Sequence, residues 1–131
     1  MAAVLLDTTV LIDLLRGRPE TAARVRAHRA QGDTLYACAV NVEEVTRGLR
    51  PAEEPAADAL FRALRIAPLG HAEGSVAGAW RRDFAVRGRT ISQADCLIAA
   101  AAAGLNARLA TANAKDFPMA GLTVDPWPAG R

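Results

Sequence analysis

The chain has 131 residues, 51% of them hydrophobic and 23% charged, which excludes a disordered protein and allows one hydrophobic core but not two ordinary ones. The formal net charge is only +2, yet all but one of the 16 basic residues, Lys115, are arginine. Arginine suits bidentate contacts with phosphate or carboxylate, so this composition permits a nucleic-acid partner without requiring one.

The two cysteines, Cys38 and Cys96, stand in apolar runs and lack the spacing of a zinc site. We therefore expect buried free thiols in a reducing compartment. The N-terminus has no basic segment followed by a long apolar stretch, and the longest apolar run, residues 96–103, is too short to span a bilayer. These features predict a cytoplasmic protein with no membrane partner.

The first part of the chain alternates short apolar strands with helices. A buried strand over residues 3–6 is followed by a helix over 8–16, which a glycine and a proline bring to an end. A second helix is expected over residues 20–30. The apolar segment TLYACAV, residues 34–40, predicts a second strand, and a helix over 41–48 follows it.

The rest of the chain continues this alternation. A helix begins near Glu53 with a proline in its first turn, and a weak strand follows at residues 66–70. Helices are expected over residues 71–86 and from the cap residue Ser92 to Ala103. Two further strands are expected over residues 107–112 and 121–125.

Short buried strands that alternate with helices predict an α/β protein. The expected architecture is a parallel sheet covered by helices on both faces, in one domain over residues 1–131. In such sheets, ligands bind at the carboxyl ends of the strands, where the strand order reverses. Polar residues at those ends are therefore candidates for a functional site.

Four acidic residues follow strands or begin helices. Asp7, Glu44 and Asp116 come after three different strands, and Asp95 begins a helix whose next eight residues are apolar. Helix N-termini favour carboxylates, so each acid alone is adequately explained as a helix cap. Three pairs have the spacing of a capping box, namely Asn41 with Glu44, Ser92 with Asp95, and Asn113 with Asp116.

Together, these acids predict a metal site. Carboxylates that converge at one edge of a sheet repel each other unless a cation lies between them. Oxygen ligands without histidine or cysteine suit Mg²⁺ or Mn²⁺, and a metal-bound water can attack a phosphodiester. Periodicity does not separate Glu43 from Glu44, because both flank the apolar face of their helix.

Four motifs in this order resemble those of a known family. They are LLDTTVLIDLLRG, NVEEVTRG, RGRTISQADCLIAAAA and RLATANAKDFPMAGLTV. Together they resemble the PIN-domain proteins, specifically the VapC toxins of toxin–antitoxin pairs, and the resemblance runs from residue 4 to about residue 127. It implies an α/β/α sandwich, a Mg²⁺- or Mn²⁺-dependent endoribonuclease, a VapB-type antitoxin partner and a homodimer.

The resemblance also assigns roles to residues. Asp7 matches the first metal-binding aspartate, and Thr9 matches the small polar residue two positions later. Glu44 matches the glutamate of the family pattern, here EVTRG, which selects it over Glu43. Asp95 matches the aspartate of the third motif.

The fourth acidic position stays open between two residues. Asn113 stands where the family carries Asp or Asn, and Asp116 follows three residues later. We favour Asp116 as an outer ligand, direct or through water, with Asn113 and Thr111 in support. No histidine is placed as a general base, because His28 falls within a helix and His71 at a helix start, and both are expected at the surface.

Single-stranded or looped RNA is the expected substrate. Four arginines that precede the Asp95 helix could flank its path, although a solvated helix face explains each of them equally well. They are Arg81, Arg82, Arg87 and Arg89.

The same residues argue against several other classes of function. A dehalogenase-type phosphotransferase needs a second aspartate where Thr9 stands, and a receiver domain needs paired acids after its first strand. A dinucleotide-binding domain needs a GxGxxG turn, which is absent. The remaining alternative is a PIN-like module that binds partners or RNA without cutting. RNA cleavage by the wild type and by Asp7→Asn discriminates between the two.

Overall fold

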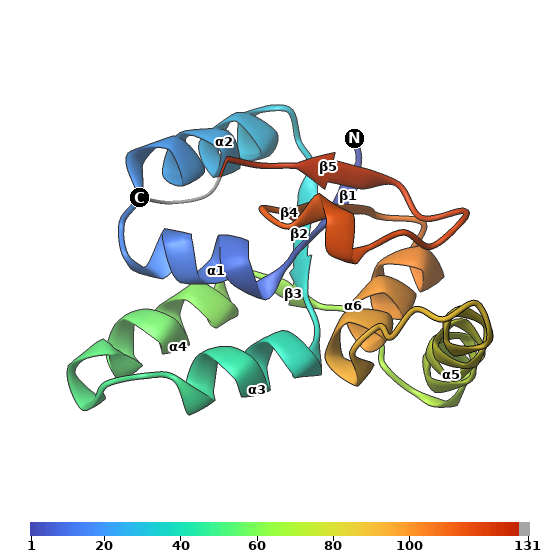
Figure 1. Ribbon diagram of the computed structural model, residues 1–131. Helices are drawn as coiled ribbons and strands as arrows, with labels where there is room; N and C mark the ends of the chain where they lie inside the picture. Colours follow the sequence, from blue (N-terminus) through green and yellow to red (C-terminus); the bar gives the residue numbers. More distant parts are fainter. Residues whose placement is uncertain (129–131) are drawn as a thin grey trace.

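A five-stranded sheet with the order β3-β2-β1-β4-β5 forms the centre of the computed structural model, which describes residues 1–128 (Figure 1). Every neighbouring pair of strands is parallel. The strands are β1 (Ala3–Leu6), β2 (Thr34–Ala37), β3 (Arg65–Ile66), β4 (Arg108–Thr111) and β5 (Val124–Pro126). Residues 129–131, which the expected single domain includes, lie outside the described residues.

Helices cover both faces of the sheet, which confirms the predicted α/β/α class. Figure 1 shows α1, α2 and α4 on one side of the sheet and α5 and α6 on the other, while α3 packs against α1, α4 and α6. The helices are α1 (Thr8–Leu15), α2 (Pro19–Ala30), α3 (Ala39–Arg47), α4 (Glu54–Arg62), α5 (His71–Val86) and α6 (Gln93–Gly104), with short 3₁₀ turns η1 (Pro51–Glu53) and η2 (Ala114–Asp116). None of the helices within residues 1–128 has the length and apolar character needed to cross a membrane.

Strand β1 is buried on both faces. Leu5 belongs to the hydrophobic cluster under α5 and α6, whereas Val4 and Leu6 belong to the cluster under α1 and α2. Successive side chains of a strand point to opposite faces, so three consecutive apolar residues serve both cores. This explains the continuous apolar run and leaves Asp7 as the first polar residue beyond it.

The border between β2 and α3 differs from the prediction. The strand ends at Ala37 and the helix begins at Ala39, whereas the sequence predicts a strand to residue 40. Cys38 is the N-cap residue, and its backbone N–H donates a 2.8 Å hydrogen bond to Oδ1 of Asn41. The predicted capping box of Asn41 with Glu44 is therefore wrong, because Asn41 is itself the third residue of the helix.

The two edge strands are also shifted. Strand β3 covers only Arg65–Ile66 instead of residues 66–70, and β5 covers Val124–Pro126 instead of 121–125. Pro126 has no backbone N–H to donate, and an edge strand tolerates this because one of its sides has no neighbouring strand.

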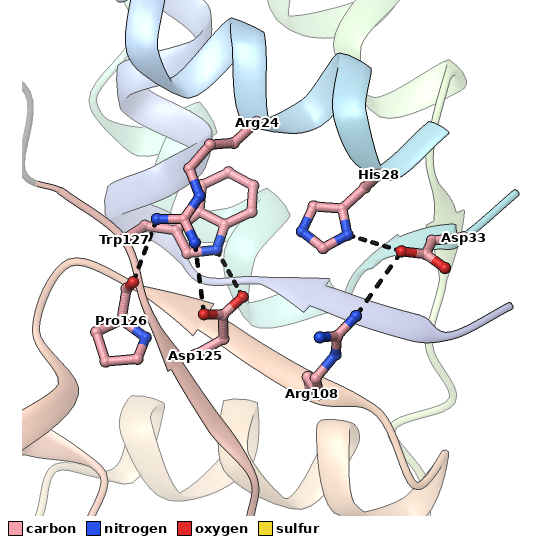
Figure 2. A network of polar contacts seen from close by, with 7 residues as sticks. All are labelled: Arg24, His28, Asp33, Arg108, Asp125, Pro126 and Trp127. Carbon is pink, nitrogen blue, oxygen red and sulfur yellow. Dashed lines mark hydrogen bonds and ion pairs between the residues drawn. The ribbon is translucent and has the colours of Figure 1, made fainter. Parts of the chain in front are cut away.

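A polar network joins α2 to the C-terminal end of β5 (Figure 2). Trp127 is buried and stacks on His28 with ring centroids 5.6 Å apart. The Trp127 indole N–H donates to Asp125, which also pairs with Arg24 at 3.5 Å. The expectation that His28 lies at the surface is therefore wrong: only 12% of its side chain is exposed.

The same network continues to Asp33 at the start of β2. Asp33 contacts Nδ1 of His28 at 2.8 Å and accepts a hydrogen bond from the backbone N–H of Ala2, also at 2.8 Å. Arg108 of β4 lies 3.7 Å from the same carboxylate (Figure 2). The hydrogen bond from His28 and that from Ala2 lower the pKa of Asp33 below its ordinary value. Asp33 thus connects α2, β1 and β4.

Candidate active site

Asp7 lies where β1 passes into α1, beside the end of β4. Its backbone N–H donates to the carbonyl of Ala110 at 2.9 Å, which extends the pairing of β1 with β4 by one bond. Its side-chain Oδ1 accepts from the backbone N–H of Thr8 at 2.8 Å, so the predicted helix cap is present. The chain returns to pair with β1 through β4 after it has moved outward through β2 and β3, so this is the point where the strand order reverses.

The second oxygen of the Asp7 carboxylate is held by two threonines. Oδ2 accepts from the hydroxyl of Thr111 at 2.7 Å and from that of Thr9 at 3.2 Å. Each hydroxyl also accepts a backbone N–H, from Asn113 at 3.0 Å for Thr111 and from Ala112 at 3.3 Å for Thr9. The two threonines that the sequence assigns to supporting roles therefore surround Asp7.

Burial raises the pKa of Asp7, and this cause outweighs the hydrogen bonds that lower the pKa. The negative charge of Glu44 raises it further. Only 5% of the Asp7 residue is exposed, so its carboxylate is mostly removed from water. An ionised Asp7 would be stabilised by a cation at this position.

Glu44 reaches the same junction from α3. Its Oε1 accepts a 2.6 Å hydrogen bond from the hydroxyl of Thr8, the residue next to Asp7. Glu43 is exposed and lines a separate pocket together with Gln93 and Leu97. The position of Glu44 beside Asp7 agrees with the prediction that Glu44, and not Glu43, belongs to the acidic site.

Asp95 lies in the first turn of α6. Its backbone N–H donates to Oγ of Ser92 at 3.0 Å, so Ser92 caps the helix as predicted. Burial raises the pKa of Asp95, and the negative charges of Asp7, Asp116 and Glu44 raise it further. The negative charges of the other three predicted acids therefore all act on Asp95.

Asp116 ends the short turn η2, which follows β4. The predicted capping box with Asn113 is not formed: Asn113 is the N-cap residue and makes no side-chain cap hydrogen bond. The guanidinium of Arg89 donates a 2.8 Å hydrogen bond to the carbonyl of Lys115 and connects the turn to the loop before α6. Arg89 is thus engaged with the segment that carries Asp116.

The four acids of this site are close enough for their charges to interact, but they do not form a complete metal-coordination shell. Within residues 1–128, no three Asp, Glu, His or Cys side chains lie close enough together to hold a metal as they stand. In the same part of the chain, the ion pairs of Arg24, His28, Arg62, Arg82 and Arg108 involve other acids, namely Asp33, Asp58, Asp83 and Asp125. Among the described residues, none of the four carboxylates forms an ion pair with a basic side chain. They therefore supply hard oxygen donors and negative charge, which fits a divalent cation such as Mg²⁺ or Mn²⁺.

Sequence reasoning missed two residues of this site. Asn41 is completely buried, and its Nδ2 donates to the Thr8 hydroxyl at 3.0 Å. Thr8 in turn contacts Glu44. A usable signal was present, because Asn41 lies four residues before the buried Val45 and so falls on the apolar face of the helix.

Comparisons with known proteins agree with this geometry. The PIN domain family matches residues 4–120. Ribonuclease VapC19 of Mycobacterium tuberculosis is 32% identical over 115 residues, which cover 88% of this chain and 92% of that protein. The chain therefore belongs to the PIN domain family. Its similarity to a VapC ribonuclease confirms the resemblance that the four sequence motifs indicate.

Solved structures show the same fold. VapBC-1 from nontypeable Haemophilus influenzae has a chain with 25% identity and a TM-score of 0.79, covering 95% of this chain and 98% of its own. VapBC2 from Rickettsia felis, bound to a DNA fragment from its promoter, has a chain with 21% identity and a TM-score of 0.83 over 95% of this chain and 98% of its own. Both structures come from toxin–antitoxin systems of the VapBC type.

Proposed function

We propose that this protein is a metal-dependent endoribonuclease that hydrolyses RNA phosphodiester bonds as the toxin of a VapBC-type pair. One observation carries the proposal: Asp7, Glu44, Asp95 and Asp116 come from four separate segments of the chain and converge at one end of the sheet. Thr8 is hydrogen-bonded to both Asp7 and Glu44, and the charges of Asp7, Glu44 and Asp116 all raise the pKa of Asp95. If these acids served only to cap their own helices, they would have no reason to lie close to one another. Membership of the PIN domain family and the similarity to a ribonuclease support the same reading.

The proposed cofactor is Mg²⁺ or Mn²⁺. Asp7 and Asp95 would hold it, with Glu44 and Asp116 acting directly or through water. When bound, the ion would polarise the phosphate and activate a water as the nucleophile. The chain's own part is to hold the ligands, and Thr9 and Thr111 do this at Oδ2 of Asp7.

The proposed RNA path runs past the arginines of α5 and the loop after it. Arg81 lines a pocket between α5 and α6 together with Gln93. Arg82 is mostly exposed and lies 3.6 Å from Asp83, so a phosphate could replace this weak pairing. Arg87 lies over the ring of Phe84, at 4.4 Å from its centre. An RNA substrate would place this activity in the cytoplasm.

The proposed antitoxin site is a groove between α1 and α3. It is lined by Ile12, Leu15, Glu44, Val45 and other residues, and encloses about 110 Å³. An apolar segment bound there would lie against Glu44 and thereby obstruct the acidic site. We also propose a homodimer, which light scattering coupled to gel filtration tests directly.

Cleavage of RNA in Mg²⁺ or Mn²⁺, with and without EDTA, tests the proposed activity. Asp7→Asn and Asp95→Asn should abolish cleavage, because each removes a charged oxygen ligand. Asp58→Asn is the matched control, since Asp58 is exposed on α4 and pairs with Arg62 of the same helix. Wild-type activity in Asp7→Asn would contradict the enzyme and favour a non-catalytic binding module.

A further inference from the structure

A chain of hydrogen bonds with a fixed direction leads from the backbone of α3 to Glu44. It begins at the backbone N–H of Cys38, which can only donate and which contacts Oδ1 of Asn41 at 2.8 Å. The other side-chain atom of Asn41 is therefore its NH₂ group. That group lies 3.0 Å from the Thr8 hydroxyl, which must accept from it.

The Thr8 hydroxyl has only one proton to give. Because it accepts from Asn41, this proton goes to Oε1 of Glu44, at 2.6 Å. Asn41 is 0% exposed, so water does not replace either of its bonds. The direction of every bond in the series is thus set by the backbone of α3.

The series does more than cap a helix. The cap of α3 needs only the carbonyl oxygen of Asn41, which serves the Cys38 N–H. The amide NH₂ of Asn41 and the hydroxyl of Thr8 add nothing to that cap. They connect the helix to the residue next to Asp7, and they end on a carboxylate of the acidic group.

We propose that Asn41 and Thr8 are positioning residues, which hold the Glu44 carboxylate in a fixed orientation beside Asp7 and so keep it available to the metal site. This role rests on the proposed metal-dependent function. Thr8 also contributes its backbone N–H to Asp7, at 2.8 Å. One residue therefore orients two of the four acids, each through a different group.

Substitutions can separate this role from folding. Thr8→Val removes the hydroxyl and keeps the backbone N–H and the side-chain shape, whereas Thr8→Ser keeps the hydroxyl. Asn41→Asp keeps an oxygen for the Cys38 N–H but replaces the donor with a second acceptor, so two carboxylates compete for the single Thr8 proton. Thr46→Val is the control, because Thr46 is exposed on the same helix.

The first readout is the affinity for Mn²⁺ alone, measured by electron paramagnetic resonance without RNA. Partners that orient metal ligands typically contribute about 10–100-fold in metal affinity or activity, and we expect losses of this size for Thr8→Val and Asn41→Asp. Thr8→Ser and Thr46→Val should bind Mn²⁺ as the wild type does. In cleavage, kcat should fall while KM for RNA stays unchanged.

A double-mutant cycle identifies Glu44 as the group through which Thr8 acts. In a Glu44→Gln background, Thr8→Val should cause no further loss of Mn²⁺ affinity. Equal losses in both backgrounds, or no loss in the wild-type background, would overturn the positioning role. Coupling between Thr8 and Glu44 in a protein that does not cut RNA would support the positioning role and overturn the nuclease.

Discussion

The hydroxyl of Thr111 donates a 2.7 Å hydrogen bond to Oδ2 of Asp7, and the two residues are 104 positions apart in the sequence. Thr111 is fully buried and also accepts the backbone N–H of Asn113. A single hydroxyl therefore joins the end of β4 and the turn after it to the carboxylate at the end of β1. Loss of this hydroxyl affects both sides of the site at once.

Thr111→Val should lower the free energy of unfolding by about 1–3 kcal/mol, because the buried Asp7 carboxylate loses its shorter hydroxyl hydrogen bond and the backbone N–H of Asn113 loses its partner. Urea denaturation measures this loss. Thr111→Ser keeps the hydroxyl and should cost only about 1 kcal/mol for the lost methyl group. A valine variant as stable as the wild type would show that the hydrogen bond makes no net contribution.

Asp95→Asn should raise the melting temperature by a few degrees at neutral pH when EDTA is present. The pKa of Asp95 is raised in the folded protein by burial and then by neighbouring negative charges. The folded state thus binds this proton more tightly than the unfolded chain, and stability falls as the pH rises from 3.8 through the folded pKa. The neutral amide avoids this cost.

The same variant should respond less than the wild type to Mg²⁺ or Mn²⁺. A bound cation favours the ionised acid and stabilises the folded state by mass action, so saturating metal should narrow or reverse the difference in melting temperature. Thermal unfolding with and without metal measures this. If Asp95→Asn melts below the wild type in EDTA, the ionised Asp95 does not destabilise the metal-free protein, and the proposed repulsion among the acids is wrong.

Asp33→Asn should destabilise the protein at neutral pH and have little effect in acid. The hydrogen bond with His28 lowers the pKa of Asp33 in the folded state, so the unfolded chain takes up the proton first. The contribution of Asp33 is therefore fully present above pH 3.8 and is lost as the pH falls through the folded pKa. Urea midpoints at several pH values test this, with Asp83→Asn at an exposed pair as the control.

Replacing glycine by alanine should stabilise the protein at one kind of position and destabilise it at another. A Cβ at Gly74 or Gly78 meets nothing within 4 Å, and both lie within α5, so alanine should stabilise the helix by about 0.5–1 kcal/mol at each. Gly17 has equally open surroundings but a φ of +71°, so alanine there should cost about 1–2 kcal/mol. Chemical denaturation of the three single variants checks both signs. A loss at Gly74 would indicate that this face of α5 is covered by another chain.

Features encoded by local pattern were predicted well from the sequence. The apolar residues before Asp7 predict a buried strand, and the alternation of strands and helices predicts the parallel sheet and its helical layers. The cap of α6 by Ser92 was also predicted, since its signal lies within one helical turn. The resemblance to PIN-domain proteins was confirmed by the family match.

Features that depend on distant partners were missed. Because Cys38 is apolar, the sequence does not indicate that β2 ends before it. The sequence predicts Asn41 as the N-cap residue, whereas Asn41 is the third residue of the helix, and its second partner, Thr8, lies 33 residues away. His28 was expected at the surface because nothing near it in sequence covers it, whereas Trp127 stacks on it from the other end of the chain. The metal-binding roles of the acids stay predictions.

The pairing of β1 with β4 has a consequence for biosynthesis. Asp7 is translated 104 residues before its neighbour Thr111, and the acid Asp116 belongs to a segment that is translated later still. The pocket cannot assemble until those late segments have left the ribosome and docked. In the proposed nuclease, a growing polypeptide would therefore not cleave RNA before these segments emerge, whereas α1 and α3, which form the proposed antitoxin groove, emerge well before them.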